Sequence, residues 1–391
     1  MSEHAESLRP PRSSSTRTRV APSRRRASRK AAPSQPLRVA VFTTSYPRHS
    51  DDFAGRFVSD AVKRMRARGV EVKVVSPGTF RDFGLSSNGT GIVGAVKRRP
   101  WLAPLLFVSM VRALRRAASG ADLVHAHWLW GGLVAAFSGK PFVVTLHGSL
   151  TAGSLNDFAL CSRCPWLVRL VLRRARAVIC VSESLANAVR EAGVRNVVFV
   201  PNGIAVPKRV GAEAQPLEVL YAGRLTAEKG VSELAEACGD MNLVVAGDGP
   251  LRTVVPQALG FLGPRDLAHR YRNAAVVVCP SHVEGFGVVC AEAMAHGKPV
   301  VASATGGLAN LVVDGETGIL VPPGDVCALR DAVERLLGDP HLRQRFGAAG
   351  RKRIRTHYSW ESVTAMTLAI YADVLPRPDT PPAAEPSISV G

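Results

Sequence analysis

Short runs of apolar residues alternate with amphipathic stretches along most of the chain. The first run, residues 37–44, is filled with apolar and β-branched residues and predicts a buried strand. Residues 55–69 carry apolar side chains at helical spacing and end at Gly69, a common helix stop, so they predict a helix. Residues 70–75 predict the next strand.

This alternation continues with strand-like runs at residues 123–125, 142–145, 177–181 and 197–200. After residues 207–209 the rhythm restarts, with runs at 218–221, 242–246, 275–279 and 299–302. Strands that alternate with helices predict an α/β fold with parallel sheets. The restart predicts two doubly wound, Rossmann-like domains that face each other across a cleft.

The domain boundary is expected within residues 206–216. We assign residues 36–208 to an N-terminal domain and residues 209–357 to a C-terminal domain. Residues 1–35 are rich in Arg, Ser, Pro and Ala, and residues 376–391 are rich in Pro. Neither segment has a periodic apolar face, so both are expected to be disordered.

Length, composition and charge change this picture in one respect. A chain of 391 residues with 46% hydrophobic content exceeds one ordinary core, in agreement with two domains. The formal net charge of +19 comes mainly from the N-terminal tail and the first domain, whereas the second domain is close to neutral. This asymmetry predicts an anionic partner for the first half of the chain.

No run approaches the roughly 20 apolar residues that span a bilayer. The nearest candidate, residues 101–111, ends at Arg112. The N-terminus is polar and basic and lacks the apolar stretch of a signal peptide, so a cytoplasmic protein is expected.

Seven cysteines are scattered along the chain, and Cys161 and Cys164 form its single C-x-x-C pair. One pair supplies two metal ligands, and no second pair follows at a suitable spacing, so no zinc site is expected. Whether the two thiols pair with each other is open.

The candidate chemistry of the second domain follows its strands. After the strand at 218–221, Gly223 allows a tight turn, and Arg224 and Lys229 place two cations near a helix start. Two fixed cations in that position suit a diphosphate, although an ordinary loop with solvated charges has the same pattern. After the next strand, Gly247 and Gly249 either let a nucleotide approach the backbone or form a plain turn.

Two carboxylates stand eight positions apart after the strand at 275–279. Glu284 lies in the loop after the strand, and Glu292 lies in a helix whose other residues are apolar. A carboxylate in an apolar helix needs a partner, and a ribose diol is a suitable one. Gly285 and Gly287 bring backbone N–H groups to the start of that helix, where they favour phosphate or sugar hydroxyls.

Together these residues resemble the retaining GT-B glycosyltransferases, in particular glycosyltransferase family 4. The resemblance covers about residues 37–374 and rests on the order and spacing of the motifs. Further matching pieces are Thr44-Ser45-Tyr46-Pro47, Asp122-Leu123-Val124-His125-Ala126-His127, Thr145-Leu146-His147-Gly148, Val200-Pro201-Asn202-Gly203-Ile204 and Asp314-Gly315-Glu316-Thr317-Gly318. It departs from the family at residues 308–310, where Pro-Glu is usual, and at residues 251–259, which are too short for the usual helix.

The resemblance implies a retaining, hexosyltransferase-type enzyme whose C-terminal domain holds the donor. Arg224 and Lys229 would neutralise the diphosphate. Glu284 would hold the hydroxyls of the donor sugar, and Glu292 those of the ribose. The backbone of Gly285, Phe286 and Gly287 would support sugar and phosphate.

In the first domain, the resemblance places Gly55 against the diphosphate when the cleft closes, and His147 near the donor sugar. The helix at residues 358–375 would cross back onto the first domain. The donor, most simply a UDP- or GDP-sugar, is a substrate, so no cofactor is implied. No metal is expected, because no D-x-D motif follows a strand. The usual family mechanism is front-face substitution, with Glu284 as a nucleophile the alternative.

The acceptor side is less defined. His125 and His127 lie on the end of a strand and Trp128 comes next, and these residues would contact the acceptor or serve packing. Residues 97–116 and 167–176 are basic and amphipathic, as in helices that lie on membranes, but also as in helices with a solvated basic face. The basic first domain fits an anionic lipid surface or a phosphorylated acceptor.

Two other functions compete with a transferase acting on a glycan, lipid-linked or small acceptor. One is a GT-B enzyme without transfer, such as a nucleotide-sugar epimerase, although those lack the combination of Arg224, Lys229, Glu284 and Glu292. The other is a nucleic-acid-binding protein that uses its Arg-rich tail. The tail lacks interleaved aromatic residues and a binding fold, so no specific nucleic acid is expected.

Overall fold

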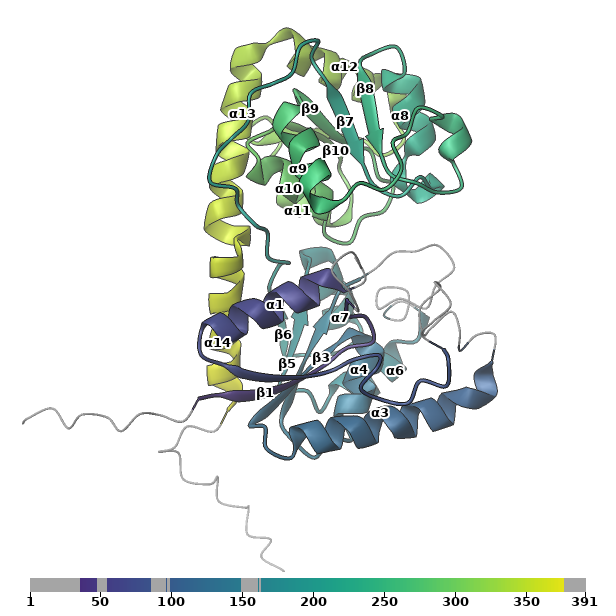
Figure 1. Ribbon diagram of the computed structural model, residues 1–391, viewed down its shortest axis with the longest axis vertical. Helices are drawn as coiled ribbons and strands as arrows, with labels where there is room; N and C mark the ends of the chain where they lie inside the picture. The colour runs from purple at the N-terminus through teal and green to yellow at the C-terminus, as the bar shows by residue number, and fades with distance from the viewer. Residues whose placement is uncertain are drawn as a thin grey trace, which may run out of the picture. The chain divides into compact units, whose positions relative to one another are not determined.

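The computed structural model describes residues 36–47, 55–85, 96, 99–148, 161 and 163–375. These residues form two separate parallel β-sheets, each covered by helices on both faces (Figure 1). The predicted α/β fold with two doubly wound, Rossmann-like domains is therefore confirmed. The predicted tails, residues 1–35 and 376–391, lie outside the described residues.

The first sheet has the strand order β2-β1-β3-β4-β5-β6, and every neighbouring pair is parallel. Its strands are β1 (Arg38–Phe42), β2 (Glu71–Val75), β3 (Leu123–His127), β4 (Phe142–Leu146), β5 (Ala177–Cys180) and β6 (Val197–Phe199). Alternate residues point to opposite faces, so Phe42 and Val124 enter one core cluster while Val41 and Leu123 enter another.

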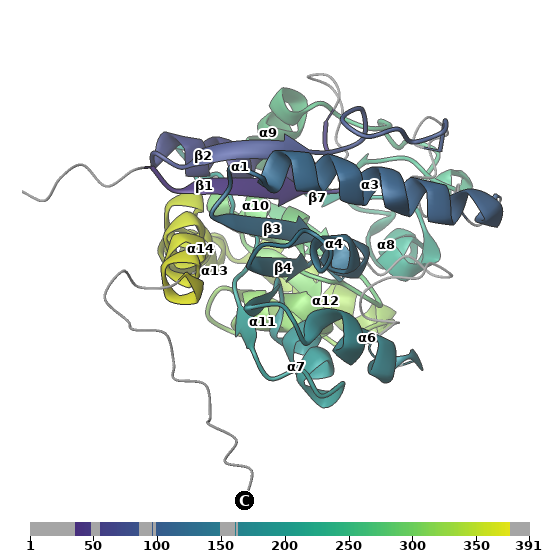
Figure 2. The ribbon, with the colours of Figure 1, turned by 90° about the horizontal axis from the view of Figure 1, so that it is seen from below.

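Helices cover both of these clusters. One face carries α3 (Ala103–Ala118), preceded by the 3₁₀ turn η1 (Pro100–Leu102), with α4 (Trp128–Ala135), α6 (Pro165–Leu172) and α7 (Glu183–Glu191). The other face carries α1 (Arg56–Ala67) and the last helix, α14 (Trp360–Val374). Figure 2 shows α14, in yellow, next to the strands of this sheet. The C-terminal helix thus packs on the first domain.

The second sheet has the order β11-β10-β9-β7-β8 and is also parallel. Its strands are β7 (Val219–Ala222), β8 (Leu243–Ala246), β9 (Val276–Cys279), β10 (Val300–Ser303) and β11 (Gly318–Val321). β11 has no counterpart among the predicted strands, because its four residues follow a turn and form no longer apolar run.

Its helices also divide between two core clusters. The first packs against α8 (Val231–Cys238), α12 (Val326–Gly338) and the start of α13 (Pro340–Arg353). The second packs against α9 (Pro264–Asn273), α10 (Val288–Ala295) and α11 (Gly306–Leu311). Short 3₁₀ turns η2 (Ala227–Lys229) and η3 (Arg252–Val254) follow β7 and β8, and η3 stands in place of a helix, as the length of residues 251–259 predicts.

A π-helical turn, η4 (Ile354–Tyr358), joins α13 to α14.

Side-chain caps fix several helix starts. Ser182, Asp325, Asp339 and Ser359 each accept a hydrogen bond from a backbone N–H in the first turn of the helix that follows.

Each sheet reverses its strand order at one point, between β1 and β3 in the first and between β7 and β9 in the second. Ligands of doubly wound sheets bind beyond the carboxyl ends of the strands at such a switch point. The loops that follow these four strands are therefore the places to look for chemistry.

Candidate active site

The most direct contact at the second switch point joins Lys229 and Glu284. Lys229 ends η2 after β7, and Glu284 lies in the loop after β9. Lys229 Nζ donates to Glu284 Oε2 at 2.6 Å, and each side chain is 20% exposed. Charges in partly buried positions interact more strongly than exposed ones, because water screens them less. The structure thus brings a predicted cation and a predicted acid together where a ligand is expected.

The loop that carries Glu284 is held by the start of α11. The Gly307 N–H donates to the Glu284 carbonyl at 2.9 Å, and the Gly285 N–H donates to Glu284 Oε1 at 3.1 Å. Gly306 has φ +47°, and a Cβ there would lie 2.0 Å from the Glu284 carbonyl oxygen. Both the backbone and the carboxylate of Glu284 are therefore fixed without a ligand, as preorganised sites require.

Arg224 is the more exposed of the two predicted cations. Its guanidinium is 46% exposed and lies 3.6 Å from Glu228. Its carbonyl accepts a hydrogen bond from the Tyr221 hydroxyl at 2.9 Å, which fixes the turn. Because an exposed ion pair is weak, the guanidinium can turn towards a phosphate at little cost.

Three predicted glycines bring the turns after β7 and β8 together. The Gly223 N–H donates to the Ala246 carbonyl at 2.9 Å. A Cβ at Gly247 would lie 1.8 Å from the Gly223 carbonyl oxygen, so only glycine permits this approach. Gly249 follows, and its N–H donates to the Asp248 carboxylate at 2.8 Å.

Gly285, Phe286 and Gly287 lead into the N-terminus of α10. The Phe286 side chain is buried and its ring lies 6.0 Å from that of Tyr358, so it serves packing. Backbone N–H groups at a helix start favour negative charge. A ligand contact from this segment would therefore come from its backbone.

Glu292 on α10 has its partner on α9. The Tyr271 hydroxyl donates to Glu292 Oε2 at 3.0 Å. Burial raises the pKa of the Glu292 carboxyl, and the hydrogen bond from Tyr271 opposes that rise. Within the described part of the chain Oε1 accepts no hydrogen bond. That oxygen is thus available to a ligand hydroxyl.

At the first switch point, the ends of β3 and β4 bring three histidines together. His125 Nδ1 is hydrogen-bonded to the Tyr371 hydroxyl at 2.5 Å, and its Nε2 to Thr145 Oγ1 at 2.7 Å. His127 Nδ1 lies 2.8 Å from His147 Nε2. The rings stack, with centroids 4.6 Å apart for His125–His127 and 5.1 Å for His127–His147.

This stack is uncharged at neutral pH. Burial lowers the pKa of His125 to about 4 and that of His147 to about 3, and it holds the pKa of His127 well below its usual range. Each ring therefore offers one donor and one acceptor. Both nitrogens of His125 are already engaged inside the protein, which agrees with a packing role. Contact of His125 or His127 with an acceptor stays a prediction.

Trp128 follows His127 and opens α4. Its φ is +63°, a left-handed conformation that is rare for a bulky residue. Its half-buried ring lies 5.1 Å from that of His147 and 6.0 Å from that of Phe57. Such backbone strain is typical of ligand sites. The acceptor role of Trp128 stays a prediction.

Gly55 occupies the N-cap of α1 with φ +67°. The preceding residues 48–54, which belong to the predicted loop, lie outside the described residues. Contact between Gly55 and a diphosphate stays a prediction.

Cys161 is buried, Cys164 is half-buried at the start of α6, and the two form no disulfide bond. Among the described residues no three His, Cys, Asp or Glu side chains are grouped as metal ligands are. Metal independence stays a prediction.

Two tyrosines that the sequence did not single out complete these arrangements. Tyr271 is the buried residue of an otherwise polar helix, which could have marked it as important. Tyr371, on α14, is fully buried against the first domain and binds His125. The partner of neither tyrosine could be read from the sequence, because each lies on a different element.

Two doubly wound domains with a charged site at the switch point of the second agree with the GT-B type that the sequence motifs resemble. Residues 54–206 match the family model Glycosyltransferase Family 4, and residues 205–353 match Glycosyl transferases group 1. The chain therefore belongs to glycosyltransferase family 4, as the resemblance implied.

Characterised relatives support this membership. The chain is 32% identical to alpha-maltose-1-phosphate synthase of Mycobacterium tuberculosis, over 86% of this chain and 100% of the relative. It is 33% identical to phosphatidyl-myo-inositol mannosyltransferase of Mycobacterium leprae, over 79% and 90%. These relatives support a glycosyltransferase over the competing interpretation as a nucleic-acid-binding protein.

Solved structures show the same fold. Sucrose-phosphate synthase from Thermosynechococcus elongatus matches with a TM-score of 0.68 and 22% identity, over 86% of this chain and 99% of that one. HepE of Anabaena in complex with UDP and glucose matches with a TM-score of 0.64 and 19% identity, over 86% and 100%. None of the helices described in this chain is long and apolar enough to cross a membrane.

Proposed function

We propose that the protein transfers a hexose from a nucleoside-diphosphate donor to a glycan, lipid-linked or small acceptor, with retention of the anomeric configuration. The observation that carries this proposal is the Lys229–Glu284 pair at the β7/β9 switch point, with Arg224 on the same turn as Lys229. Lys229 and Glu284 are fixed in position, whereas the exposed Arg224 can move. Two cations and a carboxylate in this arrangement suit a sugar joined to a diphosphate.

In the proposed complex, Arg224 and Lys229 oppose the charge of the diphosphate, and Glu284 binds hydroxyls of the donor sugar. Cleavage of the anomeric bond leaves negative charge on the diphosphate and positive charge on the sugar ring. Preorganised cations and the start of α10 stabilise the negative charge as it develops. Glu292 binds the ribose hydroxyls through its unpaired Oε1, while Tyr271 holds its Oε2.

Retention is proposed to proceed by front-face substitution, in which a phosphate oxygen of the leaving group takes the proton of the acceptor hydroxyl. Glu284 is a poor nucleophile here, because both of its carboxylate oxygens already accept hydrogen bonds. Proton NMR of the purified glycoside reports the configuration of the new bond through the signal of its anomeric proton. An inverted product would contradict this part of the proposal.

The first domain is proposed to bring Gly55 against the diphosphate and His147 near the donor sugar. His127 fixes the ring of His147, and Trp128 borders the acceptor. These groups are uncharged, which suits the hydroxyls of a sugar.

The reaction is proposed to need neither a metal ion nor a cofactor, so turnover should be unchanged in EDTA.

The donor is proposed to be a UDP- or GDP-sugar, and the UDP bound by HepE of Anabaena favours the former. A thermal-shift screen of UDP-, GDP- and ADP-sugars identifies the base, because a ligand that binds the native state raises its melting temperature. We expect one class of nucleotide sugar to raise the melting temperature of the wild type and of the exposed-surface control Arg265→Ala equally. We expect no shift in Arg224→Met/Lys229→Met. A rise in melting temperature that persists in the double variant would contradict the assigned donor site.

We further propose that the first domain rests on an anionic membrane at its cytoplasmic face. Trp101 in η1 is 68% exposed, and Leu105 and Val108 on α3 are 55% and 44% exposed. On α6, Trp166 and Leu170 are 68% and 48% exposed. Each set recurs at helical spacing, and both helices belong to the same face of the first sheet. Exposed basic residues accompany them, namely Arg112, Arg115 and Arg116 on α3 and Arg169 and Arg173 near α6.

Aromatic and aliphatic side chains beside arginines are typical of surfaces that bind anionic lipid. Sedimentation with vesicles of phosphatidylglycerol and phosphatidylcholine tests the surface. We expect binding by the wild type, and loss of binding by Trp101→Ser/Trp166→Ser. Wild-type binding by this variant, or equal binding to purely zwitterionic vesicles, would contradict the proposal.

A further inference from the structure

A cavity of about 620 Å³ lies in the second domain, apart from every residue of the candidate active site. It is bounded by the linker residues 210–215 on one side and by α13 and η4 on the other. Pockets that hold small organic ligands have this size. Neither the family resemblance nor the proposed reaction uses it.

The lining of this cavity is strongly basic. It contains five cationic side chains, Lys298, Arg343, Arg351, Lys352 and Arg355, and a single carboxylate, Glu213. A concave surface with an excess of one charge concentrates ions of the opposite sign.

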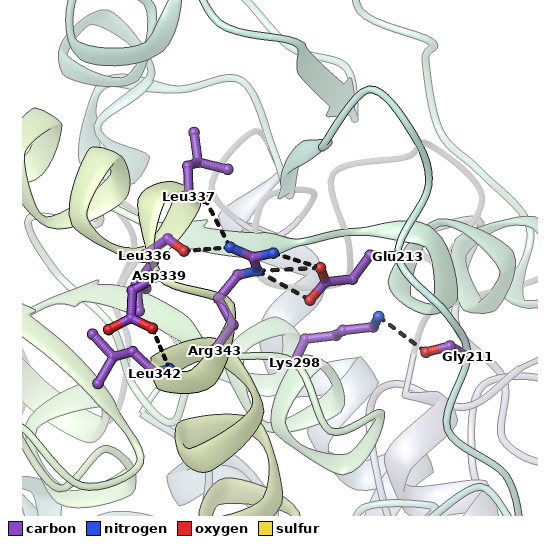
Figure 3. Close-up of polar contacts among 8 residues, drawn as sticks. All are labelled: Gly211, Glu213, Lys298, Leu336, Leu337, Asp339, Leu342 and Arg343. Carbon is purple, nitrogen blue, oxygen red and sulfur yellow. Dashed lines mark hydrogen bonds and ion pairs between the residues drawn. The ribbon is translucent and has the colours of Figure 1, made fainter.

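Arg343 and Glu213 both line the cavity and neutralise each other, and Figure 3 shows their contacts. Arg343 Nη2 donates to Glu213 Oε2 at 2.8 Å and Nε donates to Oε1 at 3.1 Å. Arg343 Nη1 donates to the carbonyls of Leu336 and Leu337, each at 2.8 Å. The guanidinium is therefore satisfied, and the only carboxylate of the lining is occupied. The other four cations of the lining form no ion pair within the described residues, although the charge of Glu213 also acts on Lys298.

Lys298 is the most unusual of these four. The residue is only 2% exposed, yet its Nζ makes a single hydrogen bond, to the Gly211 carbonyl at 3.3 Å, within the described part of the chain (Figure 3). An ammonium group has three donors, and a buried one without compensation is costly. Burial lowers the pKa of Lys298, in line with that cost. A bound anion would accept the remaining donors.

The other three cations lie on α13 and η4, which bound the cavity on the side opposite the linker residues 210–215. Arg351 donates to the carbonyls of Pro207 and Ala295, which ties α13 to the linker. Lys352 and Arg355 are exposed and form no ion pair within the described residues. Burial lowers the pKa of Arg351, and repulsion by Arg355 lowers it further. An anion between these side chains would relieve that repulsion.

We propose that this cavity is a second ligand site, which binds a small organic phosphate with at least two negative charges. Lys298 supplies the buried contact, and Arg351, Lys352 and Arg355 supply the outer ones. The ligand would touch the linker and the end of α13, which are the two covalent connections between the domains. The proposal rests on this geometry alone and does not depend on the proposed transfer reaction.

Isothermal titration calorimetry with fructose 1,6-bisphosphate tests the site, with fructose as its uncharged counterpart. We expect the bisphosphate to bind the wild type and Arg224→Met/Lys229→Met with equal affinity, and fructose not to bind. Lys352→Ala/Arg355→Ala should bind at least about tenfold more weakly, because charge-assisted hydrogen bonds are lost. Arg265→Ala/Arg335→Ala removes two exposed arginines elsewhere in the domain and should bind like the wild type.

Three results overturn the proposal. They are no binding to the wild type, loss of binding in Arg224→Met/Lys229→Met, and equal weakening in the two surface variants. Lys298→Met provides an independent check on the buried contact, and its circular dichroism reports whether the domain has folded. A folded Lys298→Met that binds with wild-type affinity also overturns the proposal.

Discussion

The two switch points of this protein have the same topology and opposite chemistry. Beside the β1/β3 switch point, the ends of β3 and β4 carry a stack of three neutral histidines with aromatic rings beside it. At β7/β9 the strand ends carry glycine turns, the exposed cation Arg224 and the ion pair of Lys229 with Glu284. One backbone arrangement thus supports an uncharged set of side chains in one domain and a charged set in the other.

The difference follows from what each site is proposed to bind. A diphosphate needs fixed positive charge, and glycines let the backbone approach it. A sugar or acceptor hydroxyl needs donors and acceptors without net charge, which neutral imidazoles supply. A fold fixes where a ligand lies, and a few side chains after the strands decide which ligand it is.

The largest expected effect concerns the charged site. Lys229→Met should lower kcat of sugar transfer by about 10²–10³, because a preorganised cation facing the developing charge is removed. Lys73→Met, on the exposed edge strand β2, is the matched control and should transfer at the wild-type rate. Wild-type turnover by Lys229→Met would show that the charge at the second switch point does not serve the reaction.

The next effect concerns the carboxylate that the second domain buries. Tyr271→Phe removes the hydrogen bond that opposes the raised pKa of Glu292, so this pKa should rise further and the donor should bind about tenfold more weakly. The acidic limb of donor binding should move to higher pH. Tyr358→Phe removes a hydroxyl that contacts the Asn310 carbonyl at 3.4 Å and not Glu292, so it should leave the pH profile unchanged.

The neutral stack predicts the pH dependence of folding. The pKa of His125 is lowered from its ordinary value of 6.5 to about 4, so the unfolded chain binds a proton that the folded protein does not. Stability is therefore complete above pH 6.5 and falls as the pH drops towards 4, by up to about 1.4 kcal/mol per pH unit for one such group.

Urea unfolding at pH 6.5, 5.5 and 4.5 measures this slope. His125→Asn should show a shallower slope than the wild type, whereas His341→Asn, at an exposed position of α13, should keep the wild-type slope. A wild-type slope in His125→Asn would show that the imidazole takes up its proton equally in both states.

The smallest effect concerns charges of the first domain that lie away from its switch point. Glu183 and Arg190 on α7 form an ion pair of 3.7 Å, and both side chains are nearly half exposed. Glu183→Gln should change the free energy of unfolding by less than about 1 kcal/mol, because exposed pairs are weak. A larger loss would mean that charge matters as much to the first domain as to the second.

Much of the fold was predictable because it depends on local patterns. Apolar and β-branched runs lie within a residue or two of β1, β7, β8 and β9, since a strand buried on both faces needs such side chains along its length. Arg224, Lys229 and Glu284 could be singled out because they directly follow those runs, and parallel strands bring their carboxyl ends to one edge.

The tertiary structure alone decided which side chains meet. Glu292 finds Tyr271 across 21 residues, and His125 finds Tyr371 across 246. Arg343 and Lys298 share one cavity with the linker, although no motif links them. Such partners depend on how distant helices pack, which periodicity does not encode. The sequence by itself therefore determined the two domains and the residues at their strand ends, whereas packing determined the charge state, the orientation and the second cavity.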